Sequence, residues 1–295
     1  MTGSAGPRRS APPAPERVSK VAVGSRAEAK ALRERAEEAS RARAKSEKLA
    51  SRARGLAAVD ESEHRVSWTA LDAGAVLVMM LVSLLGSDAV LGSRVVALMP
   101  GAGQALARMA VLGAFHLLQL GLLAFLANRH RSSLLSAFGF ASRPGAGRAG
   151  ATAVLVLVMV VVTRAATTLW GVTAEAIGWA PPPAGGITAV FGSGAWGLLA
   201  AIVIFVVLGP FAEELAFRGV VLRVLGERYG RWPAILGTAA LFALYHFEPW
   251  TLVPLFVLGV ASGWLAMSRR SLRAAIALHA LYNGVVVGAA YWLAR

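Results

Sequence analysis

The sequence contains no cysteine, which excludes disulfide bonds, thiol catalysis and cysteine-ligated metal. No apolar segment follows the first arginines, so no secretory signal peptide is predicted. Charged residues are scarce, at 16%, whereas hydrophobic residues make up 56% and the mean hydropathy is +0.59. These values are typical of a polytopic membrane protein and not of a soluble globular one.

The scarce charge is concentrated near the N-terminus. Residues 1–66 hold 15 of the 30 lysines and arginines and 9 of the 16 acids. The net charge of +14 would suit a nucleic-acid partner, but no aromatic residues interleave with the basic ones, so we predict no nucleic-acid binding. A basic cytoplasmic tail beside anionic lipid head groups accounts for the charge better.

The composition divides the chain into two parts. Residues 1–25 are rich in Pro, Ala, Ser and Gly, which predicts disorder. Residues 26–54 favour a solvated, partly formed helix with too few apolar residues for a packing seam. We therefore predict that residues 1–66 form a cytoplasmic tail, disordered to partly helical, and that residues 67–295 form a transmembrane domain.

The second part is predicted to be an all-α polytopic membrane protein with about seven transmembrane helices. The fifth and sixth apolar segments are shorter than the roughly 20 residues that a span needs, which is tolerated where helices pack against protein or line a cavity. The apolar segments fall near residues 69–91, 105–127, 151–171, 196–217, 233–248, 250–267 and 273–293.

Loop charge predicts the topology. Basic residues collect on the cytoplasmic side of membrane proteins. The loops 92–104 and 172–195 contain a single basic residue, Arg94, whereas the alternate loops are rich in arginine. We therefore expect a cytoplasmic N-terminus and an external C-terminus. The Ala-, Arg- and Gly-rich composition further suggests a multi-pass protein of a bacterial plasma membrane.

Two adjacent glutamates, Glu213 and Glu214, lie in the fourth apolar segment. An ionisable group at the bilayer centre costs about 3 kcal/mol, so such groups are functional candidates by default. Pro210 removes a helical hydrogen bond just before them. Glu214 and Arg218 are four residues apart and share a helix face, while Glu213 points about 100° away. Taken alone, this segment fits a catalytic site and a structural charge cluster equally.

Polar residues also occur on two later segments. Phe242 and His246 share a face in the fifth, and His279 and Asn283 share a face in the seventh. A single intramembrane histidine is more often a packing residue, and His116 in the second segment is interpreted in this way. Two histidines and a glutamate pair on three segments instead favour contacts among these residues, because polar groups without partners are costly to bury.

These residues resemble the three motifs of the CaaX protease and bacteriocin-processing (CPBP, or Abi) family, over about residues 190–292. That family comprises intramembrane endopeptidases, including the prenyl-protein endopeptidases that trim CaaX tails. The resemblance implies an active site inside the helix bundle that hydrolyses a peptide bond in a membrane-associated peptide or protein. The motifs are Glu213-Glu214-x-x-x-Arg218, Phe242-x-x-x-His246 and His279-x-x-x-Asn283.

The resemblance also implies roles for these residues. Glu213 would be the general base for a hydrolytic water that His246 helps to hold or activate. His279 and Asn283 would donate hydrogen bonds to the developing oxyanion. Supporting roles fall to the remaining motif residues: the Glu214–Arg218 pair would hold the first motif in place, and Phe242 would shape the cavity.

Metal dependence stays open at the level of sequence. Glu213, His246 and His279 would make a zinc ligand set of the His₂Glu kind, so one zinc ion is the candidate cofactor. The family has been discussed both as a metalloprotease and as a glutamate-dependent protease. If Glu213 were a ligand, Glu214 would have to serve as the base.

The helix rise creates a problem of depth. Glu213 and His279 lie about 10 Å from the cytoplasmic ends of their segments, but His246 lies about 20 Å along its own. The three meet if the fifth segment begins below the surface or tilts. They also meet if the fourth helix continues towards Tyr229, and we predict one of these arrangements.

Other classes fit less well. No HExxH or GxGD motif occurs, and Ser262 with His279 lacks the spacing of a rhomboid-like dyad. A non-catalytic scaffold or immunity protein on the same fold is the main alternative. A transporter is less favoured, because no internal repeat is present. We assign structural roles to Arg164 and Glu248.

Overall fold

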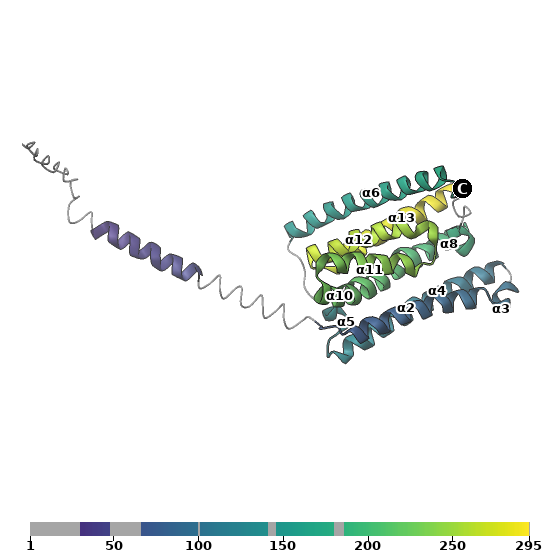
Figure 1. Cartoon of the computed structure of the whole chain (residues 1–295), viewed down its shortest axis with the longest axis horizontal. Helices are drawn as coiled ribbons and strands as arrows, with labels where there is room; N and C mark the ends of the chain where they lie inside the picture. Colours follow the sequence, from purple (N-terminus) through teal and green to yellow (C-terminus); the bar gives the residue numbers. More distant parts are fainter. Residues whose placement is uncertain (1–29, 48–65, 100, 141–145, 180–185, 295) are drawn as a thin grey trace, which may run out of the picture. The chain divides into compact units, whose positions relative to one another are not determined.

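The computed structural model describes residues 30–47, 66–99, 101–140, 146–179 and 186–294 (Figure 1). The chain divides into two compact units, Met1–Ser62 and Glu63–Arg295.

In the first unit, residues 30–47 form one helix in which every residue is exposed. Two ion pairs four residues apart support it: Lys30 Nζ lies 3.8 Å from Glu34 Oε1, and Arg41 Nη2 lies 3.8 Å from Glu37 Oε2. The predictions for the rest of the tail lie outside the described residues.

The described residues of the second unit form helices joined by turns and short loops, with no strand among them, as the sequence predicts. Its elements are α2 (Ala70–Leu91), α3 (Arg94–Ala97), α4 (Gly101–Arg129), α5 (Leu134–Ala137), α6 (Ala146–Ala176), α7 (Gly186–Phe191), α8 (Ala195–Ala201), η1 (Ile202–Leu208), α9 (Gly209–Glu214), η2 (Leu215–Val221), α10 (Leu222–Tyr229), α11 (Arg231–Tyr245), η3 (Pro249–Thr251), α12 (Leu252–Arg269) and α13 (Leu272–Leu293).

Six helices in the described part of the chain are long and apolar enough to cross a membrane. The predicted count of seven is not confirmed, because the segment expected near 233–248 forms α11, which has only 15 residues. The cytoplasmic position of the N-terminus also stays a prediction. The six candidate spans are Ala70–Leu91, Gly103–Arg129, Ala149–Ala176, Ala195–Tyr229, Pro249–Arg269 and Leu272–Leu293.

The fourth span is a single helical rod of 35 residues, Ala195–Tyr229, with two π-helical stretches. These stretches, η1 and η2, lie on either side of α9, which ends at Glu214. In the π register a carbonyl bonds the N–H five residues later, so each stretch changes the angular position of the residues that follow. The acidic pair therefore lies in a short α-helical piece between two register shifts.

The fourth helix reverses into α11 at Gly230, whose φ of 80° favours glycine. Nearly equal numbers of residues separate Gly230 from Glu213 and from His246, so both lie about 25 Å from the turn. The helix does continue to Tyr229, which confirms one of the arrangements predicted from the depth problem.

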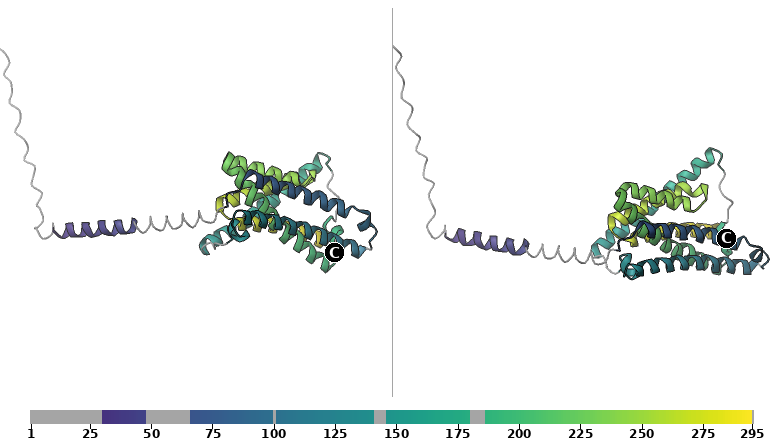
Figure 2. Two further views of the ribbon diagram at one scale, coloured as in Figure 1. Left: turned by 90° about the horizontal axis from the view of Figure 1, so that it is seen from below. Right: turned by 60° about the horizontal axis from the view of Figure 1, so that its bottom comes forward.

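The fourth span lies at the centre of the bundle (Figures 1 and 2). On one side α4 packs against η1 and α9, and α2 packs against α4 and η2. On the other side α13 packs against η1, α9 and η2, and α6 covers α12 and α13. The part of the fourth span that carries Glu213 and Glu214, α9, therefore packs against protein on two sides.

Candidate active site

The centre of the site is Glu214, which is 0% exposed. Its Oε1 accepts a hydrogen bond from Arg218 Nη1 at 3.0 Å and another from His279 Nδ1 at 2.9 Å. The first contact is the i, i+4 pair expected from the sequence, and the second joins α9 to α13. A carboxylate that accepts two charge-assisted bonds is held in one orientation.

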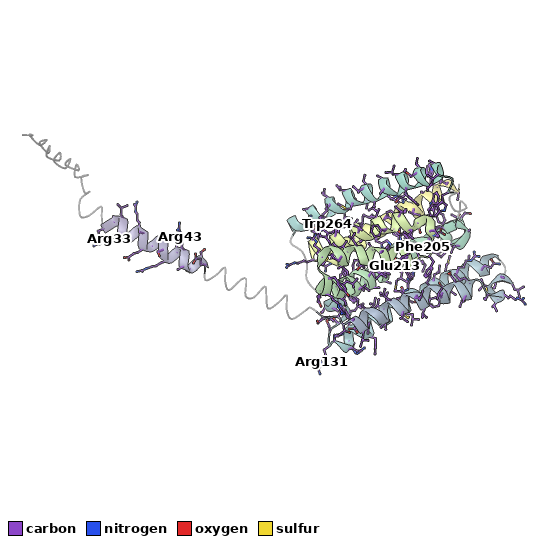
Figure 3. All side chains as sticks on the ribbon, viewed as in Figure 1. Arg33, Arg43, Arg131, Phe205, Glu213 and Trp264 are labelled. Atoms are coloured by element: carbon purple, nitrogen blue, oxygen red, sulfur yellow. The ribbon has the colours of Figure 1, made fainter. Side chains whose placement is uncertain are left out.

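Glu213 is the accessible acid of the pair. Its side chain is 12% exposed, against 0% for that of Glu214. Its Oε2 lies 3.9 Å from Nε2 of His279, and Figure 3 places the residue within the bundle. Because Nδ1 of His279 donates to Glu214, the imidazole lies between the two carboxylates with Nε2 directed towards Glu213.

Phe242 packs the motif residues together. Its side chain is fully buried, and its ring centroid lies 4.9 Å from that of His246 and 5.4 Å from that of His279. The guanidinium carbon of Arg218 lies 4.5 Å from the same centroid, a cation–π distance. One ring therefore contacts three polar side chains, and the cavity-shaping role implied by the resemblance stays a prediction.

His246 follows the last residue of α11 and acts as its C-cap. Its Nδ1 lies 2.8 Å from the carbonyl oxygen of Phe242, and since a carbonyl only accepts, Nδ1 carries the proton. Nε2 is then the nitrogen that can accept a hydrogen bond in the neutral ring.

Asn283 compensates for the proline in the fourth helix. The N–H of Gly209 bonds Ile204 O in the π register, and the next bond of that register would join Phe205 O to residue 210. Pro210 has no N–H to give. Asn283 Nδ2 instead donates to Phe205 O at 2.9 Å, which satisfies that carbonyl from α13.

A comparison with protein families identifies this region. Residues 195–285 match the family model for Rce1-like type II CAAX prenyl endopeptidases. We call residues 195–285, which match this model, the Rce1-like domain. The match confirms the resemblance inferred from the motifs and includes all seven motif residues. No curated protein and no solved structure matches the chain significantly. With the six apolar helices, the Rce1-like domain indicates an integral, multi-pass membrane protein of a protease family.

The environment of the Rce1-like domain includes polar residues to which the sequence assigns no part in the site. His116 is expected from the sequence to be an unaccompanied packing residue, but its Nδ1 lies 3.1 Å from Oε1 of Gln119, which is 3% exposed. Tyr245 lies beside His246, with ring centroids 5.2 Å apart. The i, i+3 spacing of His116 and Gln119 is a signal that could have revealed their pairing.

The predicted zinc ligands are not assembled as a set. Among the residues that the structure describes, no three His, Cys, Asp or Glu side chains are grouped closely enough to hold a metal ion. Glu213 faces His279, whereas Nδ1 of His246 bonds its own helix. The arrangement of the Rce1-like domain therefore does not support the metalloprotease interpretation, and we derive no step through a metal.

Two other charged residues have contacts of a structural kind. The guanidinium carbon of Arg164 lies 5.1 Å from the ring centroid of Tyr282, which joins α6 to α13. Glu248 caps η3, where its Oε1 accepts from Trp250 N at 3.2 Å. These contacts agree with the structural roles that we assign to both charges.

Arg218 also ties the first motif to α12, because its Nη2 donates to Gly259 O at 3.1 Å. A Cβ at Gly259 would lie 2.9 Å from the Cα and Cβ of Ala239 on α11, so this approach requires glycine. We expect Gly259→Ala to separate α11 from α12 and to lower stability by about 1–3 kcal/mol.

Thermal unfolding of the purified protein in detergent would test this expectation. Gly288→Ala is the matched control, because nothing lies within 4 Å of a Cβ at that position. Equal melting temperatures for the two variants would contradict the close packing of α11 on α12.

Proposed function

We propose that this protein is an intramembrane endopeptidase that hydrolyses a peptide bond in a membrane-associated peptide or protein, with Glu213 as the general base. The observation that carries the proposal is the position of His279 between two unlike carboxylates. Nδ1 bonds the buried Glu214 at 2.9 Å, and Nε2 lies 3.9 Å from the accessible Glu213. The orienting contact and the reactive contact are thus on opposite nitrogens of one ring.

The proposed reaction follows from these two contacts of His279. Glu213 removes a proton from a water molecule while the water oxygen attacks the carbonyl carbon of the scissile peptide. The C–N bond then breaks, and the proton passes from Glu213 to the leaving nitrogen. His246, whose Nε2 can accept a hydrogen bond, helps to hold that water, and the imidazoles of His246 and His279 both pack against the ring of Phe242.

The remaining motif residues support this reaction. Glu214 and Arg218 hold His279 in place, because Oε1 of Glu214 accepts hydrogen bonds from both Arg218 and His279. Asn283 uses one amide hydrogen to bond Phe205 O, and its second hydrogen is the one proposed to reach the oxyanion. Asn283 therefore combines a positioning role in the fourth helix with a contact to substrate.

Proteolysis by the purified full-length protein would test the proposal. The substrates are a quenched farnesylated CAAX peptide, suggested by the family, and a quenched library of membrane peptides. We expect wild-type cleavage and its loss in Glu213→Ala, His246→Ala and His279→Ala at matched folding. Cleavage that survives in all three variants would refute the site.

The same assay decides metal dependence. Each reaction is run with and without a chelator, and zinc content is measured on the purified protein. We expect cleavage to persist with chelator, since the three candidate ligands are not grouped. Loss of cleavage that added zinc restores would show a metalloenzyme and would move the base role from Glu213 to Glu214.

The absence of cleavage from every substrate would instead favour the non-catalytic scaffold on the same fold. Binding without turnover would then be measured with the farnesylated peptide in lipid nanodiscs.

A further inference from the structure

Arg164 of α6 lies near the middle of the third candidate span, Ala149–Ala176. At the rise of an α-helix, the nearer end of that span is about 18 Å away. Arginines snorkel to the head groups from positions near the ends of a span, and Arg164 is not at such a position. A charge at this depth needs a partner, because its desolvation is otherwise costly.

The partner that the protein supplies to Arg164 is an aromatic ring. Its guanidinium carbon lies 5.1 Å from the ring centroid of Tyr282 on α13, which packs beside α6. Within the described part of the chain, no carboxylate lies within ion-pair distance of Arg164, and no oxygen accepts a hydrogen bond from it. The structural contact with Tyr282 offsets part of the desolvation cost and leaves the five N–H donors of the guanidinium without an acceptor.

Two other arginines inside candidate spans have acceptors. Nη1 of Arg108 donates to Ala189 O at 2.7 Å. Arg218 donates to Glu214 and to Gly259 O. The unused donors of Arg164 are therefore not a general property of the arginines in this bundle.

The ring beside Arg164 is held in one orientation. Tyr282 is 5% exposed, and its hydroxyl lies 2.9 Å from Oγ1 of Thr167 on α6. Oγ1 of Thr167 donates its own proton to Thr163 O at 2.9 Å, so the hydroxyl of Tyr282 is the donor to Thr167. The ring is thus fixed against α6 at the position where it contacts the guanidinium.

Helix α13 connects this charge with the proposed active site. Tyr282 follows His279 by three residues, which is about 4.5 Å along the helix axis and about 60° around it. The next residue is Asn283, to which we assign the oxyanion contact. An extended peptide advances about 3.3 Å per residue. A substrate with its scissile carbonyl at Asn283 can therefore reach Arg164 within a few residues.

The depth of Arg164 selects among the anions that could bind it. The phosphates of lipids lie in the head-group region, beyond the ends of the span. Acidic side chains are rare in the apolar segments of membrane proteins. Every peptide, in contrast, ends in a carboxylate, whatever its side chains. The planar guanidinium fits a carboxylate through two parallel N–H···O bonds.

We propose that Arg164 binds the C-terminal carboxylate of the peptide substrate, so that the enzyme favours bonds close to the C-terminus. This inference rests on the proposed endopeptidase function. It adds a specificity-determining residue outside the three motifs and gives α6 a part in substrate binding.

The test uses the full-length protein in nanodiscs of phosphatidylcholine and the quenched peptide that the wild type cleaves best. The peptide is made in two forms, one with a free C-terminal carboxylate and one with a carboxamide. We expect the wild type to cleave the carboxylate form with a kcat/KM about 10–100-fold higher, chiefly through KM, because charge-assisted hydrogen bonds are lost with the carboxamide. Arg164→Met should cleave both forms at the rate that the wild type shows with the carboxamide.

Arg108→Met is the matched control, because it removes an arginine that already has a protein acceptor. It should keep the wild-type preference for the carboxylate form, with all variants compared at equal melting temperature. Equal cleavage of the two forms by the wild type, or a preference that survives in Arg164→Met, would overturn the inference while the endopeptidase stands. An equal fall for both forms in Arg164→Met would show that the residue is structural only.

A lipid phosphate as the anion is tested by repeating the assay with phosphatidylglycerol in the nanodiscs. We expect the preference for the carboxylate form to be unchanged. An effect of Arg164→Met that appears only with this anionic lipid, and equally for both peptides, would assign Arg164 to the lipid and overturn the inference. A wild type that cleaves no peptide would overturn the proposed function and this inference together.

Discussion

Glu213→Gln is expected to lower kcat by about 10²–10⁴-fold, the usual contribution of a general base, while the melting temperature stays at the wild-type value. The variant keeps the size of the side chain and removes its ability to accept a proton. Glu213 Oε2 lies 3.9 Å from Nε2 of His279, beyond hydrogen-bond distance, so the substitution removes no direct hydrogen bond to that ring. Steady-state cleavage and thermal unfolding of the same preparation measure the two quantities.

Glu214→Gln is the control for this prediction, because it makes the same chemical change one residue away. Glu214 is fully buried and accepts bonds from Arg218 and His279, so its loss should lower the melting temperature as well as the activity. An unchanged kcat in Glu213→Gln, or an exchange of the two phenotypes, would show that the base has been assigned to the wrong acid.

Arg218→Met is expected to destabilise the protein by about 3–5 kcal/mol, the cost of leaving a buried charge without its partner. Both side chains of the Arg218–Glu214 pair are 0% exposed, at an N–O distance of 3.0 Å. The same guanidinium also bonds Gly259 O and lies over the ring of Phe242. Removing it therefore loosens the fourth helix from both α11 and α12.

Thermal unfolding followed by tryptophan fluorescence would measure this loss. Arg228→Met is the matched control, because Arg228 is exposed near the end of α10 in the same span. The double variant Arg218→Met with Glu214→Gln should regain part of the lost stability, since it removes the unpaired charge. A melting temperature for Arg218→Met equal to that of Arg228→Met would disprove the buried pair.

Contacts within one helix are accessible to sequence reasoning. The 3.6-residue period determines which residues four apart share a face, so the Glu214–Arg218 pair follows from the spacing of the two residues alone. The same holds for Phe242 and His246, whose rings lie 4.9 Å apart. Apolar length and composition likewise identify a membrane protein, because the bilayer sets the length of its spans.

Contacts between helices are not accessible in the same way. Whether His279 lies between the two glutamates depends on the rotation of α9 against α13, and two π-helical stretches alter that rotation. Pro210 predicts a break in the fourth helix, but not that Asn283 bonds Phe205 O across it. No spacing rule links residues that lie 78 positions apart.

The sequence by itself therefore determined the class of protein, the all-helical fold, the protease family and the local pairs within each motif. Only the tertiary structure decided which acid is buried, which nitrogen of His279 faces Glu213, and which residues of α4 and α11 surround them. The physical reason is that backbone periodicity acts over a few residues and is set by local sterics. Burial and inter-helix hydrogen bonds instead depend on how the helices pack side by side.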